Sequence, residues 1–173
     1  MLLNAVFNHT IYKDWFLPSK DELYLMYTEL KAHSIGGFSN DVYQSSSEKD
    51  ASNAWGYLFL NGASTFDYKT TTRSARACRT FTSTATYALR DIGPAGGYIF
   101  YASSGTYYEA ARGLSTPPGE FTSVEWSDPN ASLLGTNTAV GTGKANTATI
   151  VAALLGHETG RAAQLCAALS IQV

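Results

Sequence analysis

The sequence predicts a mixed α+β domain that has a mostly antiparallel sheet and two to three helices. Three observations lead to this expectation: an apolar stripe at helical spacing, aromatic residues that alternate around a hairpin signal, and two further helical segments near the end of the chain. The 173 residues suit a single domain that spans 1–173. A chain of this length can bury roughly 70% of its unfolded surface, so it needs no metal to fold.

The clearest predicted helix covers residues 20–33. Ser19 is a good N-cap residue, and Glu22 three positions later completes a capping box. The pair Gly36 and Gly37 is expected to end the helix. Four apolar residues at positions i, i+3, i+4 and i+7 form one stripe that is typical of a core-facing helix: Leu23, Met26, Tyr27 and Leu30.

Two paired strands are predicted after a turn-rich stretch. Trp55, Tyr57 and Phe59 alternate along the first strand and therefore share one face. The dipeptide Asn61-Gly62 is a strong hairpin signal before a returning strand.

The remaining segments complete the expected order of elements. Residues 73–81 alternate as a strand, and the apolar run 98–101 is typical of a buried strand. Residues 103–143 are rich in Gly, Pro, Ser and Thr, which indicates a long loop. Two helices are predicted at the end, over 145–155 and 159–169.

Composition excludes several classes of function. Twelve basic and 14 acidic residues give a net charge of −2, and no Lys/Arg cluster stands out, so nucleic acid is not an expected partner. No stretch approaches the ~18 apolar residues of a membrane span.

The sequence contains no motif that predicts catalysis or a metal. His9, His33 and His157 share no ligand spacing. The segment GTGKA at 141–145 resembles a phosphate loop but lacks its first glycine and the final Ser/Thr. We therefore expect no catalytic residues, no cofactor and no metal site.

Several motifs resemble one known family. Residues 14–23, DWFLPSKDEL, are similar to the DWRLPTKAEL signature of bacterial C-type-lectin-like domains of the type found at the C-terminus of Legionella collagen-like adhesin. Further similar segments are YQSSSE at 43–48, ARACR at 75–79 and GPAGGYIFY at 93–101. This family belongs to the branch of the fold that includes formylglycine-generating enzymes. The resemblance implies a C-type-lectin-like fold.

The order of these motifs is circularly permuted relative to the family. Residues 14–81 resemble the family's C-terminal half, 82–90 form a Thr-rich linker, and 91–173 resemble its N-terminal half. The permutation implies that strand 98–101 lies beside strand 73–81. Two alternatives are a fragment that spans two tandem domains and a strand-exchanged dimer.

The two cysteines leave two interpretations open. Spacing alone is compatible with two buried thiols or with one long-range disulfide between Cys78 and Cys166. In C-type-lectin-like folds a disulfide commonly joins the first helix to the last strand, and the resemblance places these two residues there. The resemblance therefore implies a Cys78–Cys166 bridge.

The resemblance implies a non-enzymatic ligand-binding or adhesion module, extracellular or on the cell surface, as part of a longer exported protein. Its partner would be a protein or a glycan. One alternative is a retroelement-diversified variable protein or phage receptor-binding domain; a formylglycine-generating-type enzyme is the third. Calcium is not expected, because DPN at 128–130 lies in the wrong part of the fold and WND is absent.

The candidate ligand-binding residues combine polar groups with aromatic rings between positions 44 and 68. An alternative for Trp55 is a place in the core, because one strand face must be buried. The candidates are Gln44, Asn53, Trp55, Tyr57, Asn61 and Tyr68.

Overall fold

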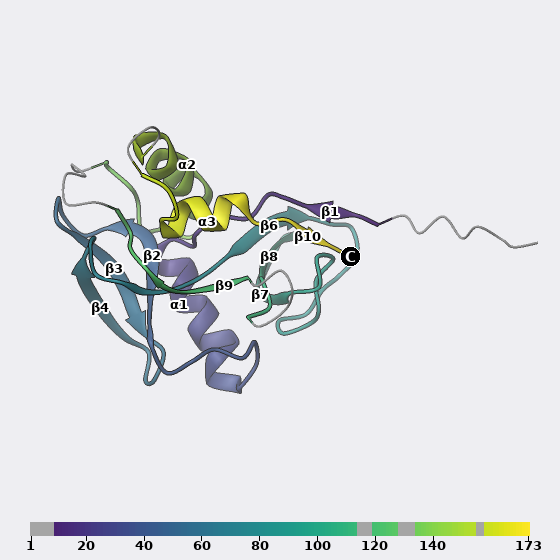
Figure 1. Cartoon of the computed structure of the whole chain (residues 1–173). Helices are drawn as coiled ribbons and strands as arrows, with labels where there is room; N and C mark the ends of the chain where they lie inside the picture. Colours follow the sequence, from purple (N-terminus) through teal and green to yellow (C-terminus); the bar gives the residue numbers. More distant parts are fainter. Residues whose placement is uncertain (1–8, 114–118, 128–133, 155–157) are drawn as a thin grey trace, which may run out of the picture.

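The computed structural model describes residues 9–113, 119–127, 134–154 and 158–173 (Figure 1). These residues form a mixed α+β fold with mostly antiparallel sheets, which confirms the predicted class. The helices are α1 (Lys20–Glu29), α2 (Gly143–Leu154) and α3 (Ala162–Ala168), with a short 3-10 helix at Lys31–His33. The strands are β1 (Ile11–Tyr12), β2 (Val42–Glu48), β3 (Asn53–Leu58), β4 (Ala63–Tyr68), β5 (Arg73–Arg76), β6 (Cys78–Thr82), β7 (Tyr98–Ser103), β8 (Thr106–Ala110), β9 (Glu120–Val124) and β10 (Ile171–Gln172).

The strands form two main sheets and a small ribbon. The larger sheet has the order β4-β3-β2-β5-β9, and its only parallel pair within the described residues is β2 with β5. The smaller sheet has the order β6-β8-β7, and β1 pairs with β10. In Figure 1, α2 and α3 lie together at the top, α1 lies below them, and the two main sheets lie on either side.

Helix α1 begins as predicted but ends earlier. Ser19 and Glu22 form the capping box: Glu22 N donates to Ser19 Oγ at 3.3 Å, and Ser19 N donates to Glu22 Oε2 at 2.7 Å. The α-helix ends at Glu29 instead of continuing to residue 33, because the chain tightens into a 3-10 turn and Ser34 takes a left-handed conformation with φ 60°. Leu23, Met26 and Leu30 of the predicted stripe are fully buried.

The predicted single strand over 73–81 is in fact two strands that belong to different sheets. Ala77 lies between β5 and β6; its N–H donates to Gly119 O and its carbonyl accepts from Ala111 N, both at 2.9 Å. These two hydrogen bonds satisfy the backbone where the chain leaves one sheet and enters the other. The alternation that indicated one strand continues through this change of sheet, so it could not reveal the break.

The prediction of a long loop over 103–143 is also wrong. This region contains β8, β9 and the start of α2. Strand β8 follows a two-residue turn at Ser104-Gly105, whose φ angles of 48° and 77° suit the tight hairpins that connect antiparallel strands. Ser104-Gly105 between two aromatic runs was the signal that could have predicted the hairpin.

The prediction that strand 98–101 lies directly beside strand 73–81 is wrong as well. Strand β8 pairs with β7 on one edge and with β6 on the other, so it lies between them. Both halves of the chain nevertheless supply strands to this one sheet.

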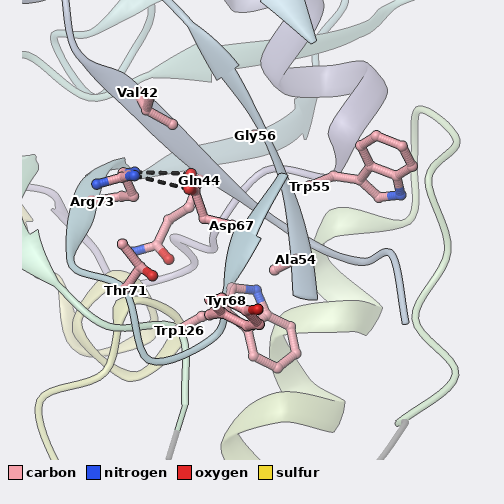
Figure 2. Close-up of a pocket in the computed structure, with 10 residues that line it drawn as sticks. All are labelled: Val42, Gln44, Ala54, Trp55, Gly56, Asp67, Tyr68, Thr71, Arg73 and Trp126. Carbon is pink, nitrogen blue, oxygen red and sulfur yellow. Dashed lines mark hydrogen bonds and ion pairs between the residues drawn. The ribbon is translucent and has the colours of Figure 1, made fainter. Parts of the chain in front are cut away.

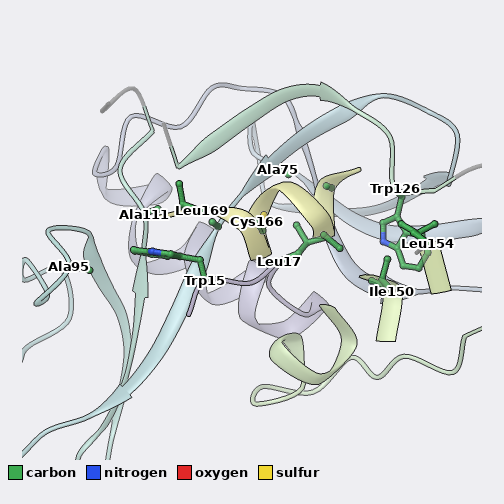
Figure 3. Packing of buried hydrophobic residues seen from close by; sticks show 14 residues of the cluster. Trp15, Leu17, Ala75, Ala95, Ala111, Trp126, Ile150, Leu154, Cys166 and Leu169 are labelled. Carbon is green, nitrogen blue, oxygen red and sulfur yellow. The ribbon is translucent and has the colours of Figure 1, made fainter. Parts of the chain in front are cut away.

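The predicted disulfide is absent, because Cys78 and Cys166 are free thiols. Both are fully buried, and they belong to two core clusters, Cys166 with Leu17 and Trp126 (Figure 3) and Cys78 with Phe16 and Phe100. Burial raises the pKa of each thiol, so both stay neutral and pack as small hydrophobic side chains. The cysteines therefore give no support to an oxidising environment.

A buried carboxylate joins the two halves of the chain. Glu22 is fully buried, and its Oε1 accepts from Gly141 N at 2.8 Å and Gly143 N at 3.4 Å, where α2 begins. The same carboxylate completes the capping box of α1. Gly143 is required here because any Cβ would collide with the Glu22 carboxylate and with Ser19 N.

We predict that Glu22→Gln destabilises the domain by about 1–3 kcal/mol, because one carboxylate oxygen becomes an N–H donor that faces other N–H donors. Urea denaturation of the two proteins measures the difference. Glu29→Gln is the matched control, since this residue pairs with Arg90 near the surface and should cost at most about 1 kcal/mol. Equal costs for the two changes would contradict the role assigned to Glu22.

We also predict that stability falls as the pH rises above about 4.5, the ordinary pKa of a glutamate side chain. Burial raises the pKa of Glu22 and of Glu109, so their contribution is fully present below the unfolded pKa and is lost as the pH rises through the folded value. Urea midpoints across this window measure the slope. Glu109→Gln should make the slope shallower, and a wild-type stability that increases with pH would contradict the prediction.

Candidate binding surface

The structure divides the predicted ligand-binding residues between the two faces of the β3–β4 hairpin. Residues directly opposite in neighbouring strands share a face. Trp55 lies opposite Phe66, and Asn53 lies opposite Tyr68, on one face. Gln44 lies opposite Gly56 in the β2–β3 pair, on the other face. The six candidates therefore do not form one continuous site.

Three aromatic side chains form an exposed surface, which we call the aromatic face: Trp55, Phe66 and Tyr68. Phe66 is 46% exposed and Tyr68 67% exposed, whereas Trp55 is half-buried. Trp55 and Phe66 meet edge to face with ring centroids 5.8 Å apart. Because β4 is the edge strand of its sheet, these rings are accessible to a partner.

Two lysines extend over these rings. Lys20 Nζ lies 3.8 Å from the centre of the Trp55 ring, and Lys49 Nζ lies 3.5 Å from the centre of the Phe66 ring. An ammonium group this close to an aromatic face is attracted by the ring quadrupole. The aromatic face therefore combines flat apolar area with two ammonium groups, of which that of Lys49 also pairs with Asp50 at 3.7 Å.

Asn53 and Asn61 stabilise turns instead of presenting free polar groups. The Asn53 amide donates to both oxygens of Asp50, and this hydrogen bond is the main cause that lowers the pKa of Asp50. Asn61 Oδ1 accepts from Ala63 N at 3.0 Å in the β3–β4 turn, where Gly62 adopts a φ of 75°. Asn61 is exposed, but its amide oxygen is already bonded within the hairpin turn.

Gln44 and Tyr57 are buried, so the expectation that the Gln44 amide is free at the surface is wrong. Gln44 is 5% exposed, and its Nε2 donates to Val124 O at 3.0 Å, which links β2 to the end of β9. Tyr57 packs on Tyr24 of α1 with ring centroids 5.3 Å apart, and burial raises its pKa. Tyr57 packs against α1 on the same face as Trp55, and Gln44 holds the opposite face, so both side chains support the hairpin.

A shallow basin lies on the face of the hairpin that carries Gln44 (Figure 2). Its floor is open at Gly56, where a Cβ would come within 2.6 Å of Tyr43 O, so no larger residue fits. Arg73 and Asp67 form a two-pronged ion pair at 2.9 and 2.8 Å at its side. Figure 2 shows Trp55 pointing away from the basin. The basin is small and its charges are already paired, so it is a weaker candidate than the aromatic face.

The charged groups near this surface are occupied by structural contacts. Lys69 Nζ lies 2.5 Å from Glu48 Oε1 in a buried ion pair, and it also lies 4.7 Å from the centre of the Trp126 ring. Glu48 further accepts from the N–H groups of Leu134 and Gly135, which fixes that segment against β2. Among the described residues no group of three His, Cys, Asp or Glu side chains could hold a metal ion. The DPN triplet at 128–130 lies outside the described residues.

The segment at 141–144 does not form a phosphate site. The N–H groups of Gly141 and Gly143, which a phosphate loop would direct at its ligand, donate to Glu22. The start of α2 therefore already holds an anion that belongs to the protein.

No protein-family model, curated protein or solved structure matches this chain. None of the helices in the described part of the chain is long and apolar enough to cross a membrane. The function must therefore be inferred from the geometry of the surface itself.

The burial of Gln44 predicts a stability difference between two candidate site residues. Gln44→Ala removes a buried hydrogen bond to Val124 O, and we expect it to lower the free energy of unfolding by about 1–3 kcal/mol. Asn61→Ala affects an exposed turn and should cost about 1 kcal/mol or less. Urea denaturation measures both. The assignment of Gln44 to the framework fails if its replacement is as mild as that of Asn61.

Proposed function

We propose that this domain is a non-enzymatic ligand-binding or adhesion module that recognises a protein or glycan through the aromatic face. The observation that carries the proposal is the exposure of Phe66 and Tyr68 on an edge strand, with Lys49 placed over the Phe66 ring. These side chains contribute little to the core, yet the hairpin beneath them is fixed by Tyr57 and Gln44. A rigid support with exposed aromatic rings is typical of recognition surfaces.

The aromatic face suits both expected classes of partner. Aromatic rings provide large contact area at a small loss of side-chain entropy, and they stack on apolar or sugar surfaces. The ammonium groups of Lys20 and Lys49 add hydrogen-bond donors at the rim.

The C-type-lectin-like fold with permuted halves is part of this proposal. It is supported by the motif resemblance, by the mixed α+β class, and by sheets to which both halves contribute strands, β5 with β9 and β6 with β8. The intervening position of β8 and the two free thiols are departures from what the resemblance implied. An extracellular or cell-surface location, within a longer exported protein, remains a proposal that follows from the resemblance alone.

A retroelement-diversified variable protein or phage receptor-binding domain is the second candidate. One observation favours it: Ser64, Phe66 and Tyr68 alternate outward on β4 and are all exposed, so they can vary without disturbing the core. Sibling sequences that differ at these positions and agree at buried Tyr57 and Gln44 would favour this candidate over a conserved adhesin.

Binding of the purified domain to a defined glycan array and to immobilised fibronectin, laminin and collagen tests the proposed function. We expect at least one specific partner, and a loss of about tenfold or more in affinity for the double variant Phe66→Ala/Tyr68→Ala, because aromatic anchors dominate interfaces. Folding should be nearly unchanged, since both side chains are exposed.

Ile92→Ala is the matched control, because Ile92 is also an exposed large apolar residue but lies next to the smaller sheet. Affinity should be unchanged in this variant. Partners that bind the double variant as tightly as the wild type, or a complete lack of partners in both panels, would count against the aromatic face.

A further inference from the structure

A second concave surface lies far along the sequence from the aromatic face. It is a groove of about 400 Å³ between the segment before α1 and the two C-terminal helices. Residues 13–16, one face of α2 and Ala167 of α3 line it. We refer to it as the α2 groove. Its size falls within the range of small-molecule sites.

The shape of the α2 groove follows from helical spacing. Lys144, Ala148 and Ala152 recur at i, i+4 and i+8 and therefore lie along one line of α2. Thr147 and Val151 lie beside them and also line the groove. The two alanines leave room that longer side chains would fill, so the hollow is a consequence of residue size at these two positions.

The opposite wall is held rigidly. Trp15 and Phe16 are buried, and Trp15 Nε1 donates to Tyr12 O at 3.1 Å. The backbone of Phe16 exchanges two hydrogen bonds with Cys78, at 2.8 and 2.9 Å. The groove is therefore formed before any ligand arrives, which reduces the entropy lost on binding.

The charge at the mouth of the groove is positive. Asp14 is engaged in a two-pronged ion pair with Arg79 at 2.8 and 3.0 Å, so its charge is neutralised within the protein. In the described part of the chain neither Lys13 nor Lys144 forms an ion pair with a carboxylate. Lys144 is close enough to act electrostatically on Asp14, which places its charge at the same end of the groove. One end is thus cationic, and the lining beyond it is apolar.

We propose that the α2 groove binds a free anionic amphiphile, with its head group at Lys144 and Lys13 and its alkyl chain along Ala148, Val151 and Ala152. Charge complementarity selects the head group, and the apolar lining selects the chain. The distance from residue 144 to residue 152 is about 12 Å along the helix, which suits an alkyl chain of roughly eight to ten carbons. The N–H groups at the start of α2 already bind Glu22, so the lysine side chains supply the contacts to the anion.

Titration calorimetry with decanoate, kept below its micelle concentration, tests this proposal. We expect one site per chain with a Kd of about 0.1–1 mM, which is ordinary for a ligand of this size. Ala152→Leu fills the groove and should weaken binding by about tenfold or more. Ala153→Leu is the matched control, because Ala153 is an equally exposed neighbour on the same helix that does not line the groove.

The head group is tested separately. Lys144→Gln should weaken decanoate binding about three- to tenfold, and Lys144→Arg should restore it, because only the charge is required. Decyltrimethylammonium, which has the same chain and the opposite charge, should bind at least about tenfold more weakly. Circular dichroism of each variant checks that the fold is intact.

Three results would overturn the proposal: equal effects of Ala152→Leu and Ala153→Leu, equal affinity for the anionic and cationic amphiphiles, or decanoate binding only above its micelle concentration. The last result would indicate a membrane-like surface as the partner. An acidic amphipathic peptide that binds where decanoate does not would assign the groove to a protein partner instead. The Phe66→Ala/Tyr68→Ala variant should bind decanoate normally, so this test is independent of the proposed function.

Discussion

The fold depends most on one buried carboxylate, that of Glu22. It accepts hydrogen bonds from Ser19 N at the N-cap of α1, from Gly141 N just before α2 and from Gly143 N at the first residue of α2. The first turns of both helices contain N–H groups that have no partner within the helix. A single anion therefore fixes two helices that are more than a hundred residues apart in the sequence. Desolvation raises the pKa of Glu22, while the three N–H donors oppose that shift by stabilising the charged form.

Further hydrogen bonds around Glu22 fix the orientation of α2 relative to the segment before α1. Thr147 Oγ1 of α2 accepts a hydrogen bond from Leu17 N at 3.0 Å and donates one to Leu17 O at 3.2 Å. The hydroxyl group therefore binds both backbone groups of Leu17 in the segment before α1. Ser19 Oγ donates to Ala139 O, and Asp21 N donates to Thr138 O. These hydrogen bonds hold segments 15–22 and 137–147 together. The α2 groove lies directly beside these segments, since Phe16 and Thr147 belong to its lining.

Local signals predicted the parts of the fold that depend on local chemistry. The capping box at Ser19 and Glu22, the hairpin at Asn61-Gly62 and the C-terminal helix through Cys166 all follow from short-range patterns, and each is present. The sequence could not show that Ala77 separates two sheets, because alternation is the same on both sides of a crossing. It also could not show that the second carboxylate oxygen of Glu22 serves α2. That contact depends on how the two halves pack.

The candidate site was predicted only in part, because the exposure of its residues also depends on long-range packing. Residue types located the β3–β4 hairpin, but their exposure depends on which neighbours cover them. Gln44 is buried because its amide meets Val124 at the end of β9, a strand that the sequence did not predict. Phe66 lies on the returning strand of the predicted hairpin, but its exposure and its contact with Lys49 depend on β4 being an edge strand. The position of Tyr68 follows from the predicted hairpin alone, and its side chain is 67% exposed.

The two surfaces proposed for binding have a common physical origin. Core packing in this domain uses large rings such as Tyr43, Phe59 and Trp126, and it leaves two places where side chains do not complete it. On β4 the rings of Phe66 and Tyr68 are large and no further strand of the described chain covers them, so apart from the Lys49 side chain over Phe66 they are exposed to a partner. Along α2 the residues Ala148 and Ala152 are too small to fill the space beside Trp15, so a hollow remains. An exposed ring and an unfilled groove have opposite requirements, because the first needs a partner with a flat or open surface and the second needs one that inserts. The two surfaces are therefore suited to different ligands, and substitutions in one should leave binding at the other unchanged.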